Sequence, residues 1–176
     1  METAENMQTE SVVMTDVEMA DTDQFLTFML AGEEYGVDIL SVQEIKGWDA
    51  VTTIPNTPEY LLGVINLRGT IVPIIDMRIR FGLDKREYGP LTVVIVLKVD
   101  YGERERTIGI VVDGVSDVYN VPEPDIKPSP DLGSTVDTEF VRGLATIQEK
   151  MVIILDIEKM FNSGDLEIID SSIEEQ

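Results

Sequence analysis

The sequence partly repeats itself, and this repetition limits the folds that the chain can adopt. The stretch GVINLRGTIVPIIDMRIRF at residues 63–81 returns later in the chain in altered form as GLATIQEKMVIILDIEKMF. Two further blocks align in the same order along the chain. The aligned blocks are residues 25–30 with 92–97, 35–45 with 108–118, and 59–81 with 139–161. Three collinear blocks predict two similar units rather than a chance likeness between strand-rich segments.

Both units are rich in short runs of Val and Ile, such as TVVIVL and MVIILDI, and Gly, Pro and Asp lie between such runs. Runs of this length and composition predict strands that are buried on one or both faces. We therefore expect a mainly β protein of two small barrels, each with about five strands and closed or nearly closed, because closure protects sheet edges. Units of about 70 residues are small, so the two should share a hydrophobic seam.

Local signals refine this expectation. Three segments are short enough for single helical turns: PEYLLG at 58–63, MRIRFG at 77–82 and EKMF at 158–161. Pro73 cannot donate a ladder hydrogen bond, which predicts an edge strand or a bulge. We expect an extended, proline-rich loop at 121–130 and a hairpin turn at 101–107.

The charge of the chain is unevenly placed. The net charge is -21, and residues 1–23 and 165–176 contain seven and five acidic residues without a basic one. We expect these ends to be acidic, disordered and solubilising tails, although the apolar VVM at 12–14 could dock on the body. An acidic body repels phosphate, so neither nucleic acid nor an anionic membrane is an expected partner.

Other sequence features lead us to expect a soluble, cytosolic protein. No apolar run approaches the ~18 residues that span a membrane, so we expect no membrane insertion. The first residues lack the basic start and apolar core of a secretion signal. The absence of cysteine fits a reducing compartment.

The sequence offers little for catalysis. Histidine and cysteine are absent, which removes the commonest general base and the commonest zinc ligands. No phosphate-binding loop or nucleophile motif occurs, so we expect no cofactor and no enzymatic activity. The repeated Asp76 and Asp156 could form a carboxylate dyad, but each precedes a short helical segment. We expect both to be helix N-caps.

The quoted segments, together with EEYGVDILSVQEI and GIVVDGVSDV, resemble the CheW family of bacterial chemotaxis coupling proteins over residues 24–164. The stretch GVINLRGTIVPIIDMR is the most specific part. The resemblance implies two SH3-like five-stranded β-barrels packed on a shared hydrophobic core, with a few short helices. It also implies a non-enzymatic adaptor that links the cytoplasmic tips of methyl-accepting chemoreceptors to the regulatory domain of the chemotaxis histidine kinase, in cytoplasmic arrays beneath the inner membrane. The alternative is the stand-alone coupling module of a fused chemotaxis regulator that lacks its receiver domain.

The resemblance also implies a receptor-binding set, which consists of Val42, Glu44, Gly63 and Arg68. For three of these residues, a purely structural role is the alternative to receptor binding. Glu44 could form a helix capping box with Ser41. Arg68 could be only a solvated turn residue beside the permissive Gly69. Gly63 could meet a backbone requirement common to both repeats, since its copy is also glycine.

A kinase-binding set is implied in the segment IKPSPDL, and its members are Ile126, Lys127, Asp131 and Leu132. The prolines of this segment fix an extended backbone and reduce the entropy that is lost on docking. The alternative is that the segment only links the duplicated units.

Overall fold

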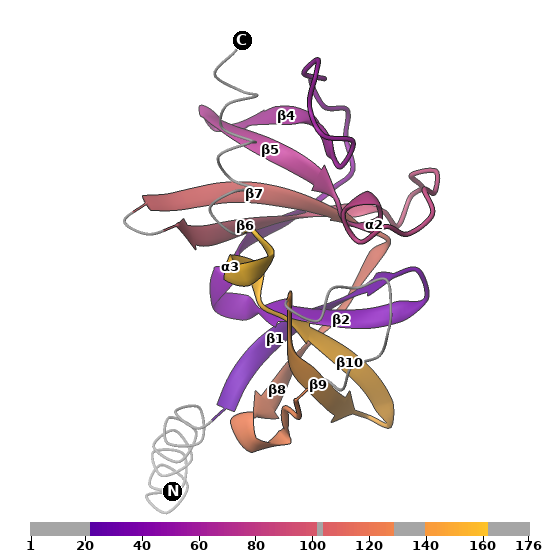
Figure 1. Ribbon diagram of the computed structural model, residues 1–176, viewed down its shortest axis with the longest axis vertical. Helices are drawn as coiled ribbons and strands as arrows, with labels where there is room; N and C mark the ends of the chain where they lie inside the picture. The colour runs from indigo at the N-terminus through magenta and orange to yellow at the C-terminus, as the bar shows by residue number, and fades with distance from the viewer. Residues whose placement is uncertain (1–21, 102–103, 129–139, 162–176) are drawn as a thin grey trace, which may run out of the picture.

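The computed structural model describes residues 22–101, 104–128 and 140–161, and these residues form two five-stranded sheets (Figure 1). We call the sheet with strand order β8-β1-β2-β10-β9 sheet A, and the sheet with order β3-β6-β7-β5-β4 sheet B. The elements, in chain order, are β1 (Thr22–Leu30), β2 (Glu33–Asp38), η1 (Ile39–Ser41), β3 (Val42–Gly47), β4 (Leu61–Leu67), β5 (Thr70–Asp76), α2 (Met77–Arg80), β6 (Val93–Tyr101), β7 (Arg104–Val112), β8 (Gly114–Pro122), η2 (Glu123–Asp125), β9 (Val141–Ile147), β10 (Lys150–Leu155) and α3 (Ile157–Met160). The mainly β class with two SH3-like five-stranded units and a few short helices is confirmed.

The two sheets do not coincide with the two sequence repeats. The first repeat supplies β1 to β5 and the second supplies β6 to β10, yet sheet A combines β1 and β2 with β8, β9 and β10. Sheet B combines the remaining strands of both repeats. The repeats therefore exchange strands, and the expectation that each repeat forms its own barrel is wrong. The exchange makes each sheet depend on both halves of the chain.

In each sheet, an isolated backbone bridge connects the two edges and partly closes the sheet. Thr52, after β3, pairs with Val64 in β4 through two backbone hydrogen bonds of 2.9 Å. Lys127, after β8, pairs with Leu144 in β9 in the same way, at 2.8 and 2.7 Å. These bridges cover part of the edge strands, which would otherwise expose unpaired backbone groups.

Two parallel strand pairs join the repeats inside the sheets, and each requires a glycine. Gly36 of β2 lies opposite Ile154 of β10, and Gly109 of β7 lies opposite Ile74 of β5. A Cβ atom at Gly109 would lie 2.6 Å from the Cδ1 atom of Ile74, and one at Gly36 would lie 3.0 Å from that of Ile154. The two glycines therefore make room for the isoleucines of the neighbouring strands.

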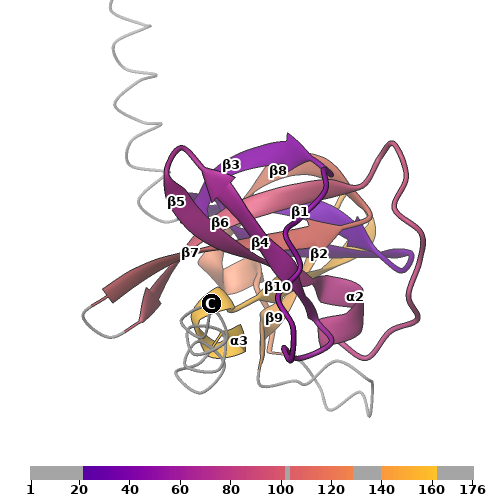
Figure 2. The same ribbon diagram turned by 90° about the horizontal axis from the view of Figure 1, so that it is seen from above.

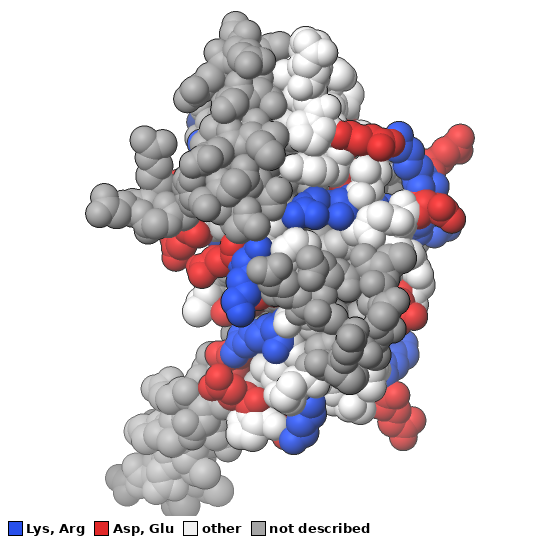
Figure 3. All heavy atoms as spheres, in the orientation of Figure 1, with Lys and Arg blue, Asp and Glu red and all other residues white. Residues whose placement is uncertain are grey.

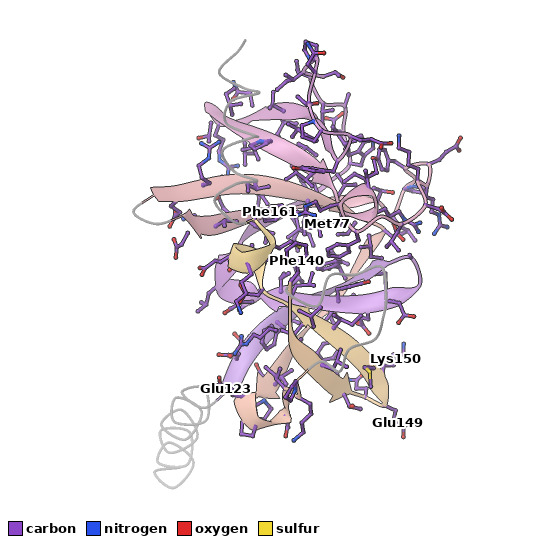
Figure 4. All side chains as sticks on the ribbon, viewed as in Figure 1. Met77, Glu123, Phe140, Glu149, Lys150 and Phe161 are labelled. Carbon is purple, nitrogen blue, oxygen red and sulfur yellow. The ribbon has the colours of Figure 1, made fainter. Side chains whose placement is uncertain are left out.

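The hydrophobic core has three parts, because the central strands are buried on both faces. A large shared core lies between the sheets and contains Phe28, Leu97, Phe140 and Phe161. Figure 4 shows Met77, Phe140 and Phe161 together in this seam. Phe25 and its neighbours fill the interior of sheet A, and Val94 and its neighbours fill that of sheet B.

Alternate residues of β6 contribute to different cores, since Val94 and Val96 point into sheet B whereas Ile95 and Leu97 face the seam. The expected shared hydrophobic seam is present.

Asp76 and Asp156 are the N-caps of the two single-turn helices, as expected. The Asp76 carboxylate accepts hydrogen bonds from the amides of Arg78 and Ile79, and that of Asp156 accepts one from the amide of Lys159. Each cap satisfies backbone donors that the first helical turn leaves free. The helical turns expected near residues 77–82 and 158–161 are thus confirmed.

Some local expectations were wrong. Residues 58–63 form a turn and the start of β4 rather than a helical turn, because Leu61 already pairs with Ile75. Pro73 lies in the interior strand β5, just before the part of β5 that pairs with β7. The hairpin expected at 101–107 is present, because β6 and β7 pair as far as Tyr101 and Arg104 (Figure 2), but residues 104–107 are strand rather than turn. Residues 121 and 122, expected in a loop, still belong to β8.

The boundary of the N-terminal tail also differs from the expectation. β1 begins at Thr22, so Thr22 and Asp23 pair with Pro122 and Val121 in sheet A. The rest of the tail and the segment 165–176 lie outside the described residues. Among the described residues, no helix is long and apolar enough to cross a membrane.

Candidate functional site

The proposed receptor-binding set is built around an ion pair. Glu44 lies in β3, at one edge of sheet B, and Arg68 lies in the turn between β4 and β5 at the other edge. The guanidinium of Arg68 donates a hydrogen bond to the carboxylate of Glu44, and this bond raises the pKa of Arg68. The side chain of Arg68 remains 68% exposed, against 29% for Glu44. The pair therefore connects the two edges and still presents its cation to solvent.

The backbone of the β4–β5 turn holds Arg68 in place. Arg68 and Gly69 both have positive φ, at 52° and 90°, as the two central residues of a type I′ hairpin require. The side chain of Asn66 accepts a hydrogen bond of 2.8 Å from the amide of Gly69. Arg68 is thus a turn residue, as one alternative held, and it is also half of the ion pair.

The second repeat lacks this arrangement. Its aligned turn carries Gln148 and Glu149, and the position aligned with Glu44 is Asp117. Asp117 instead contacts the edge of β1, where its backbone carbonyl accepts a hydrogen bond from the hydroxyl of Thr27. The ion pair is therefore a property of one sheet, and it makes the two sheets chemically different.

Val42 and Glu44 have different environments although they are two residues apart. Val42 is half-buried and packs against the shared core. The expected capping box is wrong, because η1 ends at Ser41 and has Asp38 as its N-cap. Glu44 lies in the strand after that helix, so its carboxylate is available to Arg68.

Gly63 has a clear structural role. A Cβ atom there would lie 2.2 Å from the carbonyl oxygen of Thr52, in the bridge that helps to close sheet B. Its copy, Gly143, would place a Cβ atom 2.6 Å from the carbonyl oxygen of Lys127 in the matching bridge of sheet A. Both glycines permit the close approach of two backbones. Gly63 therefore meets a backbone requirement that is common to both repeats, as the structural alternative for this residue held.

The proposed kinase-binding set is described only in part. Ile126 is half-buried and packs against the core inside sheet A. Lys127 is exposed, forms the backbone bridge to Leu144, and donates from its ammonium group to the carbonyl of Pro124 at 3.1 Å. Asp131 and Leu132 lie outside the described residues. This segment is thus more than a linker, because it helps to close sheet A.

The sequence reasoning missed several exposed apolar side chains. Leu40 in η1 is 87% exposed and lies close to Val42 in the chain, while Ile45 in β3 is 43% exposed. The segment VQEIKG does not alternate regularly between apolar and polar residues, so no sequence pattern marks Ile45 as exposed. No sequence pattern marks Leu40, because the exposure of a side chain in a single helical turn depends on tertiary packing.

A network around Asp113 was also missed. The carboxylate of Asp113 accepts two hydrogen bonds from the guanidinium of Arg78, at 2.8 and 2.6 Å, and one from the amide of Ala31. Partial burial opposes ionisation, but these donors hold the pKa of Asp113 below its ordinary value. The network connects α2, the β1–β2 turn and the β7–β8 turn.

A second hydrogen bond near this network involves Tyr88, whose hydroxyl donates to the carboxylate of Asp76. Burial is the larger cause and this hydrogen bond the smaller cause of the raised pKa of Tyr88.

The surface shows no dominant area of one charge on the face drawn in Figure 3, where the Lys and Arg side chains of the described residues alternate with Asp and Glu. No group of three or more potential metal ligands occurs in the part of the chain that the structure describes.

Comparison with known proteins identifies the family. The family model described as the CheW-like domain matches residues 24–165. The chain belongs to the CheW family. The chemotaxis protein CheW of Klebsiella aerogenes is 49% identical over 148 residues, which span 84% of this chain and 87% of that protein. The chemotaxis protein CheW of Rhizobium meliloti is 37% identical, over 82% of this chain and 90% of that protein.

A solved structure supports the same conclusion. The scaffolding protein TtCheW from Thermoanaerobacter tengcongensis superposes with a TM-score of 0.72 at 38% sequence identity, and the match covers 81% of this chain and 90% of that one. The similarity to these CheW proteins spans both sheets. It therefore favours a CheW coupling protein over the coupling module of a fused regulator.

Proposed function

We propose that this CheW-family chain is a non-enzymatic chemotaxis adaptor that couples the cytoplasmic tips of chemoreceptors to the regulatory domain of a histidine kinase. The observation that carries this proposal is the CheW-like match over residues 24–165, together with relatives that are named chemotaxis protein CheW. An adaptor needs surfaces for two partners rather than a reactive centre. We expect the protein to work in the cytoplasm, within receptor arrays at the inner membrane.

The receptor-binding face is assigned to sheet B around Glu44 and Arg68, with Val42 beside them. The exposed guanidinium of Arg68 offers planar donors that suit carboxylate or backbone oxygens of a helical tip. Ile45 in the same strand is also exposed, but it points to the opposite face of β3 from Glu44 and is not assigned to this surface. Gly63 contributes by keeping the edge of sheet B closed rather than by direct contact.

The kinase-binding face is assigned to the segment that begins at Ile126 and Lys127 in sheet A and continues to Asp131 and Leu132. Because the two faces belong to different sheets, one chain can contact both partners.

Co-sedimentation of three purified components tests the coupling function. A receptor cytoplasmic fragment, the kinase regulatory domain and this chain should form a ternary complex, and the kinase domain should enter the pellet with the receptor only when this chain is present. Equal recovery of the kinase domain without this chain would contradict the adaptor role.

A surface control separates the ion pair from general charge effects. Arg68→Ala should reduce recovery with the receptor. Lys85→Ala, which removes another exposed pair with Glu59 at 2.9 Å, should leave recovery unchanged. Equal losses in both variants would argue against a specific role of Arg68.

A further inference from the structure

Arg80 lies where the two halves of the molecule meet. Arg80 is the last residue of α2, and the aligned position in the second repeat is Met160, the last residue of α3. Tyr60 and Phe140 are aligned with each other in the same way. The backbone repeats this correspondence: the amide of Asp76 donates to the carbonyl of Tyr60 at 2.9 Å, and the amide of Asp156 donates to that of Phe140 at 2.8 Å.

The side chain of Arg80 contacts both members of this aromatic pair. Its guanidinium carbon lies 5.4 Å from the ring centre of Tyr60 and 4.9 Å from that of Phe140. Tyr60 directly precedes β4 of sheet B, whereas Phe140 directly precedes β9 of sheet A. The cation therefore holds one ring from each side of the seam, at distances typical of cation–π contacts.

A hydrogen bond adds a third contact across the seam. The Nη2 atom of Arg80 donates to the backbone carbonyl of Met160 at 3.3 Å. The two aligned positions thus contact each other, one as a cation and one as a carbonyl. A second arginine at position 160 would oppose the first by charge repulsion, and Met160 is instead fully buried in the shared core.

Directional contacts of this kind differ from the rest of the seam. The shared core consists mainly of apolar side chains, and hydrophobic attraction has no preferred direction. Apolar surfaces can slide over one another at modest cost, whereas a guanidinium between two rings has a defined plane and defined donors. Both rings are tied to helix N-caps through their carbonyls, so rotation of one sheet against the other would pull the rings away from the guanidinium.

We propose that Arg80 is a positioning residue that fixes the orientation of sheet A relative to sheet B. This inference goes beyond the adaptor function and does not depend on it. Its consequence for a scaffold is that surfaces on the two sheets keep a constant angle.

Distance measurements between spin labels test the proposal directly. The chain has no cysteine, so the double variant Asp100→Cys and Thr146→Cys carries one label on β6 of sheet B and one on β9 of sheet A, both at exposed positions. Pulsed electron paramagnetic resonance then reports the distribution of distances between the sheets. We expect a narrow distribution in this labelled parent, and a broader or shifted one after Arg80→Met, which places the aligned residue at position 80.

Arg142→Met is the matched control. Arg142 also lies over an aromatic ring, 5.6 Å from the centre of Phe25, and pairs with Asp23 at 2.8 Å, but all three residues belong to sheet A. Its loss should leave the distribution as narrow as in the labelled parent. Equal broadening in Arg142→Met would overturn the proposal, because it would show general softening of the fold.

A second variant covers the case in which Arg80→Met does not fold. Arg80→Lys keeps the positive charge but loses the planar guanidinium. If both variants fold, its distance distribution should be intermediate between those of the labelled parent and Arg80→Met. If only Arg80→Lys folds, its distribution should be broader than that of the labelled parent. The proposal would be overturned if the distance distribution of Arg80→Lys, and that of Arg80→Met where it folds, were the same as in the labelled parent.

Discussion

At the scale of single residues, the molecule depends on glycines that allow two backbones to approach. Gly63 and Gly143 stand at matching places in the two sheets, each beside a backbone carbonyl that a methyl group would strike. Because the neighbouring atom is backbone, the clash cannot be relieved by a side-chain rotation. These glycines therefore control sheet closure, and binding surfaces near them depend on that closure.

We predict that Gly63→Ala and Gly143→Ala each lower the free energy of unfolding by about 1–3 kcal/mol, as expected for steric overpacking. Urea denaturation followed by circular dichroism measures this. Gly47→Ala, at the end of β3, is the control, since a Cβ atom there meets nothing within 4 Å. Unchanged stability in Gly63→Ala together with weaker receptor binding would instead make Gly63 a direct contact.

The ion pair of Asp113 and Arg78 gives a prediction about pH. The folded pKa of Asp113 is lowered, so its contribution to stability is present above the unfolded value of roughly 3.9 and is lost as the pH falls through the lower folded value. Asp113→Asn should cost about 1–3 kcal/mol near neutral pH, because it leaves a mostly buried guanidinium without its anion. Chemical denaturation of the parent and variant from neutral pH downward should show the difference shrinking below about pH 4. A constant difference across this range would contradict the account.

At the scale of elements, the two equivalent hairpins differ in how well their turns suit the backbone. The β4–β5 turn has glycine at its second central position, whereas the β9–β10 turn has Gln148 and Glu149, with φ of 50° and 68°. Figure 4 shows Glu149 and Lys150 at the tip of this second hairpin. Left-handed backbone costs a non-glycine residue energy, so the second hairpin is the more strained.

We therefore predict that Glu149→Gly stabilises the protein by about 1 kcal/mol, since glycine adopts this conformation without a steric penalty. Gly69→Ala in the first hairpin should have the opposite effect of similar size. Thermal unfolding of both variants in parallel is the measurement. Loss of stability in Glu149→Gly would show that the side chain of Glu149 makes a contact that outweighs the strain.

At the scale of the whole molecule, sequence patterns predict the strands and the helix caps better than they predict the assembly. The continuous apolar run that contains Val94, Ile95 and Val96 indicates a strand that is buried on both faces, and the positions of Asp76 and Asp156 indicate the helix caps, because these are local effects. The exchange of strands between repeats is not local. Both repeats have the same pattern whether β1 and β2 stay with β3 to β5 of their own repeat or join β8 to β10 of the other, so only tertiary pairing distinguishes the two arrangements.

The same difference between local and non-local effects applies to the candidate site. The resemblance to the CheW family brought Glu44 and Arg68 forward as separate contacts, but their ion pair depends on two sheet edges that are distant in sequence. Asp113 and Arg80 were not singled out at all, because a charged residue in a short loop or helix usually indicates a solvated surface. Their partners come from segments that the sequence does not place near them.

The central claim is that this chain presents separate faces to a receptor and to a kinase. Isothermal titration of Arg68→Ala and Leu132→Ala against a receptor fragment and the kinase regulatory domain tests it most directly. We predict that Arg68→Ala weakens receptor binding by about 1–3 kcal/mol and spares kinase binding, as for a contact arginine. Leu132→Ala should do the reverse. If Arg68→Ala lowered both affinities together with the melting temperature, Arg68 would be only a structural turn residue and the two-face account would be contradicted.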